Sequence, residues 1–364
     1  MLSRTTFGTL LTLAGLLAPA SSWQLEVHNQ IGFMADEMIS NAARDMVASI
    51  LEPEYEGSLG RAAGWADTIR RGPYAYSYTW HFISARDNPP DDCGLYYHRD
   101  CQAGGCVVQQ IANQTQILQS CLRAARRGAE AETTDDESYS TGSPDKMVCS
   151  EALKWITHFI GDVAQPLHTS ERSFGGNSVK VKFNGTDSNL HQVWDKQILY
   201  ALAPLPASGP PPTSLHPYFA GLVARTRADA FRAPRSTWAG CDLDARRGTY
   251  CAEQWARDSN SIVCDYAYGR WSEGMGDLLL GPERYAHGAM HIVEQQIAKA
   301  AFRLAGWLDA LVERVGAEEE DSAGAGAGAE AGGRTDRAGS KGKGKLRIQG
   351  DDDILLLQQE TVEL

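Results

Sequence analysis

The stretch HFIGDVAQPLH, residues 158–168, is the most informative part of this chain. If it is helical, His158 and Asp162 lie four residues apart and project from one face. Pro166 lacks an N–H and clashes with the preceding turn, so we expect the helix to end or kink there. His168 can then reach the same cavity from the loop that follows.

A second pair with the same spacing, His191 and Asp195, lies in NLHQVWD, residues 189–195. Imidazole and carboxylate groups together are the usual ligands of zinc. A lone His/Asp pair is more often a surface or helix-capping pair. Two pairs and an additional His, in a chain with only nine His, favour a site for more than one metal ion.

Residues 1–22 have the features of a signal peptide. Arg4 supplies the positive start, and the apolar run from Leu10 to Leu17 is too short to span a bilayer. Cleavage after Ser22 would leave Trp23 as the first residue. No other stretch reaches about 18 apolar residues, so we expect a soluble, secreted protein with no membrane partner.

Eight cysteines fit an oxidising compartment. Three of them, Cys93, Cys101 and Cys106, lie in a loop rich in Pro, Asp and Gly, and no CxxC pair occurs, so disulfides are favoured over a cysteine zinc site. The sequons at Asn113 (NQT) and Asn184 (NGT) are expected to carry N-linked glycans. The net charge of −12 argues against a nucleic-acid partner, unless bound metal ions reverse the local field.

Hydrophobic spacing predicts a mainly α chain with one small β-hairpin. The hairpin is expected over SVKVKFNG, residues 178–185, which alternates apolar and polar residues and ends at Asn-Gly. We expect helices over residues 24–50, 58–71, 107–126, 147–160, 190–202, 217–232, 251–262 and 284–315. We expect a single domain over residues 23–316, followed by a disordered low-complexity tail over residues 317–364.

Residues upstream can complete a larger metal site. Trp23 and His28 are five residues apart at the expected mature start, Asp67 lies in GWAD and His81 in WHF. An α-amino group has a pKa of about 8, and it becomes a ligand when a metal holds it deprotonated beside its own carbonyl. Alone, His28 would be an ordinary helix His. The nine candidate ligands are Trp23, His28, Asp67, His81, His158, Asp162, His168, His191 and Asp195.

The order of these motifs resembles that of a known family. Trp with a His five residues on, WAD, HF followed by DNPP and a Cys-rich loop, HFIGDVAQPLH, GGN and NLHQVWD occur in this order. The set is similar to that of the secreted zinc-dependent, single-strand-specific nucleases of fungi and plants, of the S1 and P1 type. The resemblance runs from Trp23 to about Trp307, includes WARDSN at residues 255–260, and leaves the tail outside.

The resemblance implies a single helical domain of the phospholipase C/nuclease-like fold with three Zn²⁺ ions in a cleft. The implied ligands are Asp67, His81 and His158 for one ion, with Asp162 bridging to a second; Trp23 and His28 for that second ion; and His168, His191 and Asp195 for the third. Zinc lowers the pKa of bound water to about 7, so hydroxide exists at neutral pH. Three bound ions would also make the cleft positive, so the net negative charge of the chain would not exclude a nucleic-acid partner.

Other residues receive roles from the same resemblance. Asp67 is expected to orient the attacking water, and Arg70 to stabilise charge on the phosphate; Arg70 could instead be a solvated helix residue. Phe82 is expected to stack an unpaired base, or else to pack in the core, and Asn189 to reach substrate. Ser84 departs from the acidic residue that the family often has there, which leaves base preference open.

Two disulfides, Cys93–Cys264 and Cys101–Cys106, are implied by the family pattern. Two others, Cys121–Cys149 and Cys241–Cys251, are expected only from proximity in the sequence.

The predicted function is zinc-dependent hydrolysis of single-stranded RNA and DNA to 5′-mononucleotides, with 3′-nucleotidase activity on 3′-mononucleotides, by a secreted monomer. The nearest alternative is a zinc-dependent phospholipase C acting on phospholipid head groups, but such enzymes tend to use Glu where this chain has Asp195 after Trp194. A non-catalytic zinc-binding protein is a further alternative, which the loss of a ligand would favour, and all nine candidate ligands are present.

Overall fold

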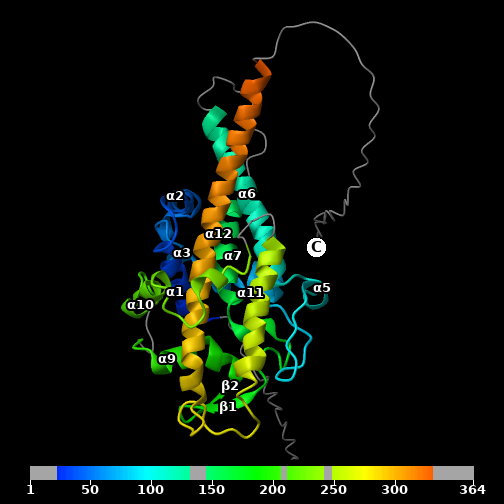
Figure 1. The fold of residues 1–364 in the computed structure, drawn as a ribbon, viewed down its shortest axis with the longest axis vertical. Helices are drawn as coiled ribbons and strands as arrows, with labels where there is room; N and C mark the ends of the chain where they lie inside the picture. The colour runs from blue at the N-terminus through cyan, green and yellow to red at the C-terminus, as the bar shows by residue number, and fades with distance from the viewer. Residues whose placement is uncertain (1–22, 132–144, 206–210, 242–247, 331–364) are drawn as a thin grey trace, which may run out of the picture. The chain divides into compact units, whose positions relative to one another are not determined.

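A computed structural model describes residues 23–131, 145–205, 211–241 and 248–330. These residues are mainly helical, with one two-stranded antiparallel sheet, as the sequence predicts (Figure 1). The expected signal peptide and residues 331–364 of the expected tail lie outside the described residues. Among the helices that the structure describes, none has the length and apolarity that a membrane crossing requires.

The elements follow one another along the chain, with η marking 3-10 segments and, for η4 and η7, π-helical segments. They are α1 (Leu25–Asp36), α2 (Asn41–Ile50), η1 (Pro53–Tyr55), α3 (Leu59–Ala62), α4 (Trp65–Ile69), η2 (Gly72–His81), α5 (Tyr97–Asp100), α6 (Val107–Ala131), α7 (Lys146–Asp162), η3 (Pro166–Thr169), β1 (Lys180–Phe183), β2 (Thr186–Asn189), α8 (Leu190–Gln192), η4 (Val193–Gln197), α9 (Ile198–Leu202), α10 (Pro217–Arg227), η5 (Arg235–Thr237), α11 (Gly248–Ile262), η7 (Val263–Ala267) and α12 (Tyr285–Glu330).

The structure divides two helices that the hydrophobic pattern predicts as continuous. The helix expected over residues 24–50 becomes α1 and α2 because the Ser40 hydroxyl accepts a hydrogen bond from the Ala43 N–H (3.1 Å) and caps a new helix. The helix expected over residues 58–71 becomes α3 and α4. The ten-residue segment η2, which follows directly, was not predicted.

The expected hairpin forms between β1 and β2. Phe183 pairs with Thr186, and the two turn residues, Asn184 and Gly185, both have positive φ (51° and 76°), as a two-residue turn of this kind requires. The Asp277 carboxylate accepts hydrogen bonds from the N–H groups of both turn residues (3.0 and 2.6 Å). The turn is therefore held from outside as well as by its own sequence.

The C-terminal helix is longer than expected. The sequence predicts a helix that ends at residue 315 and a disordered tail from residue 317, but α12 continues to Glu330. Ala and Glu, which have high helix propensity, make up nine of residues 316–330 and favour the extension, although four Gly in the same run oppose it. One compact unit of the chain ends at Glu318, and a second begins at Glu319.

All eight cysteines lie in the described part of the chain, and all are paired. The disulfides are Cys93–Cys264, Cys101–Cys106, Cys121–Cys149 and Cys241–Cys251, which confirms the four expected pairs.

The buried apolar residues form two clusters, and the stretch HFIGDVAQPLH passes from one to the other. Phe159 and Ile160, at the end of α7, belong to the first cluster. Ala164 and Leu167, just beyond the helix, belong to the second. The polar side chains of this stretch are therefore buried where the two clusters meet.

Candidate metal centre

The end of α7 supplies the first two candidate ligands. His158 and Asp162 project from one face, as their spacing predicts, with His158 Nε2 3.1 Å from Asp162 Oδ2, and both side chains are fully buried. The helix ends at Asp162, and η3 begins at Pro166, which confirms the expected stop. His168 lies in η3, and its Nδ1 is 3.5 Å from Asp162 Oδ1.

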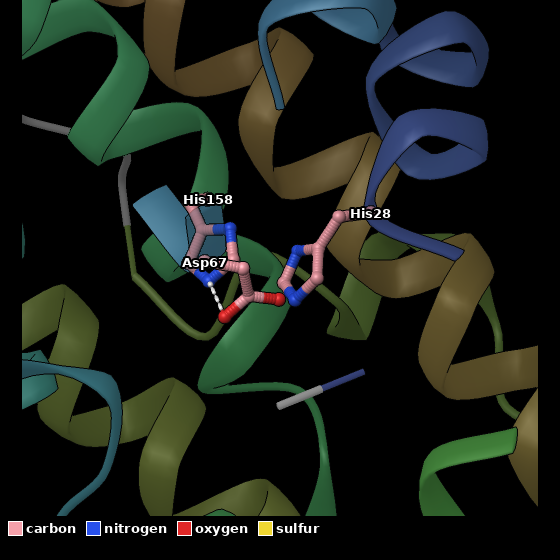
Figure 2. Close-up of side chains that lie close together, drawn as sticks. All are labelled: His28, Asp67 and His158. Atoms are coloured by element: carbon pink, nitrogen blue, oxygen red, sulfur yellow. Dashed lines mark ion pairs between the residues drawn. The ribbon is translucent and has the colours of Figure 1, made fainter. Parts of the chain in front are cut away.

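Three other segments bring residues to this pair. His81, the last residue of η2, places Nδ1 2.9 Å from Asp162 Oδ2 and 3.1 Å from His158 Nε2. His28, on α1, places Nε2 3.3 Å from Asp162 Oδ1, and its ring stacks on that of His158 with centroids 3.8 Å apart. Asp67, on α4, places Oδ1 3.6 Å from His158 Nε2 (Figure 2).

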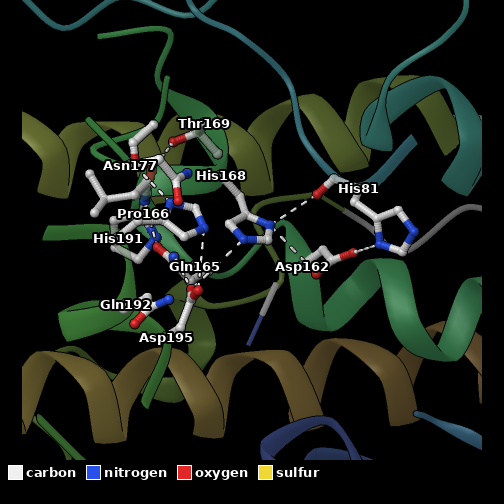
Figure 3. Close-up of polar contacts among 12 residues, drawn as sticks. His81, Asp162, Gln165, Pro166, His168, Thr169, Asn177, His191, Gln192 and Asp195 are labelled. Atoms are coloured by element: carbon white, nitrogen blue, oxygen red, sulfur yellow. Dashed lines mark hydrogen bonds and ion pairs between the residues drawn. The ribbon is translucent and has the colours of Figure 1, made fainter. Parts of the chain in front are cut away.

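A further group lies on the other side of Asp162. The rings of His168 and His191 are stacked, with centroids 5.2 Å apart. The Asp195 carboxylate lies 3.3 Å from His191 Nε2 and 3.9 Å from His168 Nε2 (Figure 3). His191 is on α8 and Asp195 is in η4, so a π-helical segment places the second i,i+4 pair.

Among the described residues, three groups of His and Asp each offer ligand atoms that lie within 4.8 Å of one another. They are His28, Asp67 and His158; His81, His158 and Asp162; and His168, His191 and Asp195. The third is the group that the family resemblance implies. The first two groups differ from the ligand sets that the resemblance implies for the first and second ions. His158 belongs to both observed groups, and His28 lies near Asp67 as well as near Asp162.

The geometry of the groups fits a divalent cation such as zinc. Three atoms, His81 Nδ1, His158 Nε2 and Asp162 Oδ2, form a triangle with sides of 2.9, 3.1 and 3.1 Å. Tetrahedral zinc with bonds of about 2.0–2.1 Å holds its ligand atoms about 3.3 Å apart. A cation or a shared proton offsets the repulsion between nitrogen lone pairs and carboxylate oxygens packed this closely, and a divalent cation can satisfy all three atoms at once.

Backbone carbonyls orient three of the imidazoles. The Nδ1–H of His158 donates to the Ala63 carbonyl (2.8 Å), that of His168 to the His81 carbonyl (2.9 Å), and that of His191 to the Gly175 carbonyl (2.6 Å). A carbonyl can only accept, so each Nδ1 carries a proton. When such an imidazole is neutral, as a metal ligand must be, its Nε2 presents the lone pair to the group. Metal-binding histidines are usually held in this way.

Burial and charge set the protonation of the centre. Burial lowers the pKa of His168 to about 3, so this imidazole is neutral at physiological pH. Burial would raise the pKa of Asp162, but the charge of His158 outweighs it, and the pKa lies well below its ordinary value. Burial raises the pKa of Asp195 well above its ordinary value, although a hydrogen bond from Gln165 opposes the shift.

Gln165 is a residue of the centre that the sequence analysis did not single out. Its side chain is fully buried, and Nε2 donates to Asp195 Oδ1 (2.6 Å) while Oε1 accepts from the Leu167 N–H (2.6 Å). Gln165 thus connects Asp195 to the segment that carries His168. Its position inside HFIGDVAQPLH, between the candidate ligands Asp162 and His168, is the sequence feature that indicates a role in the centre.

Trp23 is linked to the third group through the residue that follows it. Its side chain is fully buried in the second apolar cluster, and the next residue, Gln24, directs its N–H at the Asp195 carbonyl (3.5 Å). The bond that would be cleaved to free the Trp23 amine joins it to Ser22, which lies outside the described residues.

The predicted catalytic and substrate-binding residues lie in different surroundings. Arg70 Nε is 3.3 Å from Asp67 Oδ1, and both side chains are only slightly exposed. Phe82 is half-buried, directly after His81. Asn189 uses its side-chain oxygen to cap α8, where it accepts from the Gln192 N–H (2.9 Å), so it has a structural role that the sequence analysis did not give it.

Both predicted glycosylation sites are exposed. Asn113 lies within α6, and Asn184 lies at the hairpin turn. Attachment of a glycan to either residue stays a prediction.

Comparisons with known proteins agree with the motif order. The family model described as S1/P1 Nuclease matches residues 23–313. Nuclease S1 of Aspergillus oryzae is 29% identical over 289 residues, which cover 79% of this chain and 91% of that protein. Nuclease P1 of Penicillium citrinum is 31% identical over 290 residues, which cover 79% and 97%, respectively. Endonuclease 2 of Arabidopsis thaliana is 30% identical over 302 residues, which cover 79% and 89%. The matched range contains every candidate ligand and all eight cysteines.

Proposed function

The chain belongs to the S1/P1 nuclease family, and from this we propose that it is a secreted, zinc-dependent phosphodiesterase. The proposed reaction is hydrolysis of single-stranded RNA and DNA to 5′-mononucleotides, together with removal of the phosphate from 3′-mononucleotides. The observation that carries the proposal is the convergence of three groups of His and Asp side chains around the end of α7. We infer that the protein acts as a monomer.

Three Zn²⁺ ions would be held by nine residues. The proposed ligands are Asp67, His81, His158 and Asp162 for the first ion; Trp23, His28 and Asp162 for the second; and His168, His191 and Asp195 for the third. When bound, zinc supplies Lewis acidity, which lowers the pKa of water to about 7 and neutralises charge on phosphate oxygens.

Asp67 and Arg70 are the residues proposed to act on the water and the phosphate. Burial raises the pKa of Asp67, but the charges of His158 and Arg70 outweigh burial and lower it, so the carboxylate is ionised at neutral pH. It can therefore accept a hydrogen bond from a water molecule and orient it. The Arg70 guanidinium carries five N–H donors, so it can hold Asp67 and donate to a phosphate oxygen at the same time.

Phe82 and Asn189 are proposed to contact the nucleotide. A half-buried ring beside the candidate ligand His81 suits stacking with an unpaired base. Because Asn189 already caps α8, any contact it makes with substrate would use the amide group that the cap leaves available.

A digest with a metal analysis tests the function. The purified mature protein is expected to contain three zinc ions per chain by elemental mass spectrometry. It should cleave single-stranded RNA and DNA oligonucleotides in preference to a duplex, release phosphate from 3′-AMP, leave phosphatidylcholine intact, and lose activity with a chelator. A protein with three zinc ions that leaves single strands and 3′-AMP intact would overturn the proposal, and cleavage of the lipid would favour a phospholipase C.

The proposed role of the Trp23 amine has its own test. Secreted protein is expected to begin at Trp23 by intact-mass measurement. A Gly-Ser extension before Trp23 is expected to lower the zinc content from three to two and to reduce turnover. Three tightly held zinc ions and full turnover in the extended protein would contradict an amine ligand.

A further inference from the structure

Residues 68–86, TIRRGPYAYSYTWHFISAR, differ in charge and composition from the chain as a whole. They contain three Arg and no Asp or Glu, although the whole chain has a net charge of −12. Five aromatic residues alternate with smaller ones between residues 74 and 82. The three Arg flank the aromatic run, and two of them face a carboxylate: Arg70 lies 3.3 Å from Asp67, and Arg86 lies 3.8 Å from Glu171. Aromatic rings beside positive charge are typical of surfaces that bind single-stranded nucleic acid.

Two of these rings are exposed on η2. The side chain of Tyr76 is 58% exposed and that of Tyr78 is 44% exposed. Tyr76 lies edge-to-face with Trp80 (centroids 5.1 Å apart, planes at 67°), and the Trp80 indole N–H donates to the Gly104 carbonyl (2.9 Å). Tyr76 is therefore supported by a ring that is itself anchored.

Tyr78 connects the exposed rings to the metal centre. Its ring lies edge-to-face with that of Phe82 (centroids 5.8 Å apart, planes at 79°), and Phe82 directly follows the candidate ligand His81. Perpendicular rings cannot cover both faces of each other, so a planar base can stack on either. Tyr78 thus extends outward from the residue proposed to hold a base at the centre, and Tyr76 lies on the same segment, two residues before Tyr78.

Charged side chains near η2 bear on whether the phosphates of a single-stranded nucleic acid can lie along it. Arg71 is exposed and directly precedes η2, at the opposite end from His81. Glu151 also faces the segment, where it accepts a hydrogen bond from the Tyr74 hydroxyl. That bond holds the carboxylate at Tyr74, beside rather than on the two exposed rings.

We propose that Tyr76 and Tyr78 form a binding site for unpaired nucleotides next to the one that is cleaved. The two rings stack bases of a flanking single strand, and Arg71 contacts its phosphates. Bases in a duplex are already stacked and paired, so the site favours single strands and longer substrates. The inference rests on the proposed nuclease function and adds a determinant of substrate length.

Steady-state kinetics on two substrates test the proposal. The holoenzyme and its Tyr76→Ala, Tyr78→Ala and double variants would be assayed on a dinucleotide, which has one phosphodiester, and on a single-stranded dodecamer. The control is Tyr250→Ala, because Tyr250 is 43% exposed but lies on α11. Tyr78→Phe keeps the ring and removes only the hydroxyl.

We expect each Ala variant to raise KM for the dodecamer by about 5- to 160-fold, which corresponds to the range measured for loss of a stacked base. The dinucleotide KM and both kcat values should stay unchanged, and Tyr250→Ala and Tyr78→Phe should resemble the wild type. Wild-type KM for the dodecamer in the double variant would overturn the proposal, as would an equal rise in KM for both substrates. If the wild-type protein cleaves neither substrate, the nuclease function fails and the inference fails with it.

Discussion

Gln165 shows how one buried amide can hold two parts of the centre together. It donates to Asp195 and accepts from the backbone of the segment that carries His168. Asp195 is fully buried, and burial disfavours its charged form. The hydrogen bond from Gln165 therefore both orients this carboxylate and helps to keep it ionised for a cation.

Gln165→Leu should weaken the proposed third zinc site without unfolding the protein. Leu has a similar volume and no donor, so Asp195 loses its hydrogen bond, and such losses beside a metal ligand typically reduce metal affinity by about 10- to 100-fold. Competition with a chromogenic chelator would measure the change. Gln116→Leu, on the exposed side of α6, is the matched control. Unchanged affinity for the third zinc ion would remove Gln165 from the centre.

The low pKa of His168 predicts how the stability of the metal-free protein depends on pH. Its folded pKa is about 3 and its ordinary value is 6.5, so between these values the unfolded chain binds a proton that the folded chain excludes. Above pH 6.5 His168 is neutral in both states, and its burial costs no proton. As the pH falls below 6.5, protonation of His168 in the unfolded chain lowers the free energy of unfolding.

Chelator-treated wild type should therefore lose stability relative to His168→Asn as the pH falls from 6.5 toward 3. The expected loss is at most about 1.4 kcal/mol per pH unit. Urea unfolding of both proteins across this range would measure it, and the comparison cancels the other titrating groups. Parallel pH profiles would show that His168 titrates normally.

At the scale of elements, the centre depends on close packing of α1 against α7. A Cβ added at Gly161 of α7 would lie 2.7 Å from His28 Nδ1 and 3.0 Å from His28 Cε1. Real Cβ atoms do not approach so closely, so a side chain there would push His28 away from Asp162. Gly161 thus allows a ligand from the first helix to reach the end of the seventh.

Gly161→Ala should lower zinc content and activity, although Ala is the better helix former. The matched control is Gly221→Ala on α10, where an added Cβ meets nothing within 4 Å. That control should stabilise the protein by about 0.4–1 kcal/mol and leave zinc content unchanged. Elemental analysis and urea unfolding would separate the two effects. Wild-type zinc content in Gly161→Ala would show that the helices can move apart without harm.

At the scale of the whole molecule, disulfides connect segments that the chain separates widely. Cys93–Cys264 joins residues 171 positions apart, whereas Cys101–Cys106 closes a loop of five. The entropy that a cross-link removes from the unfolded chain grows with loop length. The first bond ties the loop after DNPP to η7, which directly follows α11 and contacts η3 of the centre.

Replacing the Cys93–Cys264 pair by Ser should destabilise the protein more than replacing Cys101–Cys106. The loop-length relation predicts losses of about 5 and about 2 kcal/mol, respectively. Equilibrium urea unfolding of the two double variants would measure the difference. Equal losses, or a larger loss for the short loop, would mean that local contacts and not chain entropy dominate these bonds.

The sequence could predict the features that depend on local spacing. The i,i+4 pair of His158 and Asp162, the stop before Pro166 and the Asn184-Gly185 turn follow from backbone geometry within a few residues, and all three are present. Local geometry did not reveal the break at Ser40 or the segment η2. The break at Ser40 interrupts an apolar pattern that would fit a continuous helix, whereas η2 lies beyond the end of the predicted helix over residues 58–71.

By itself, the sequence determined which side chains are available for metal chemistry and the order in which they occur, because residue type and local spacing decide both. Tertiary structure alone decided their arrangement: His158 lies in two groups, carbonyls of distant segments set the imidazole tautomers, and Gln165 holds Asp195. These are contacts between segments far apart in the chain. Such contacts form only when two apolar clusters pack together and enclose the polar groups between them, and no local pattern records that packing.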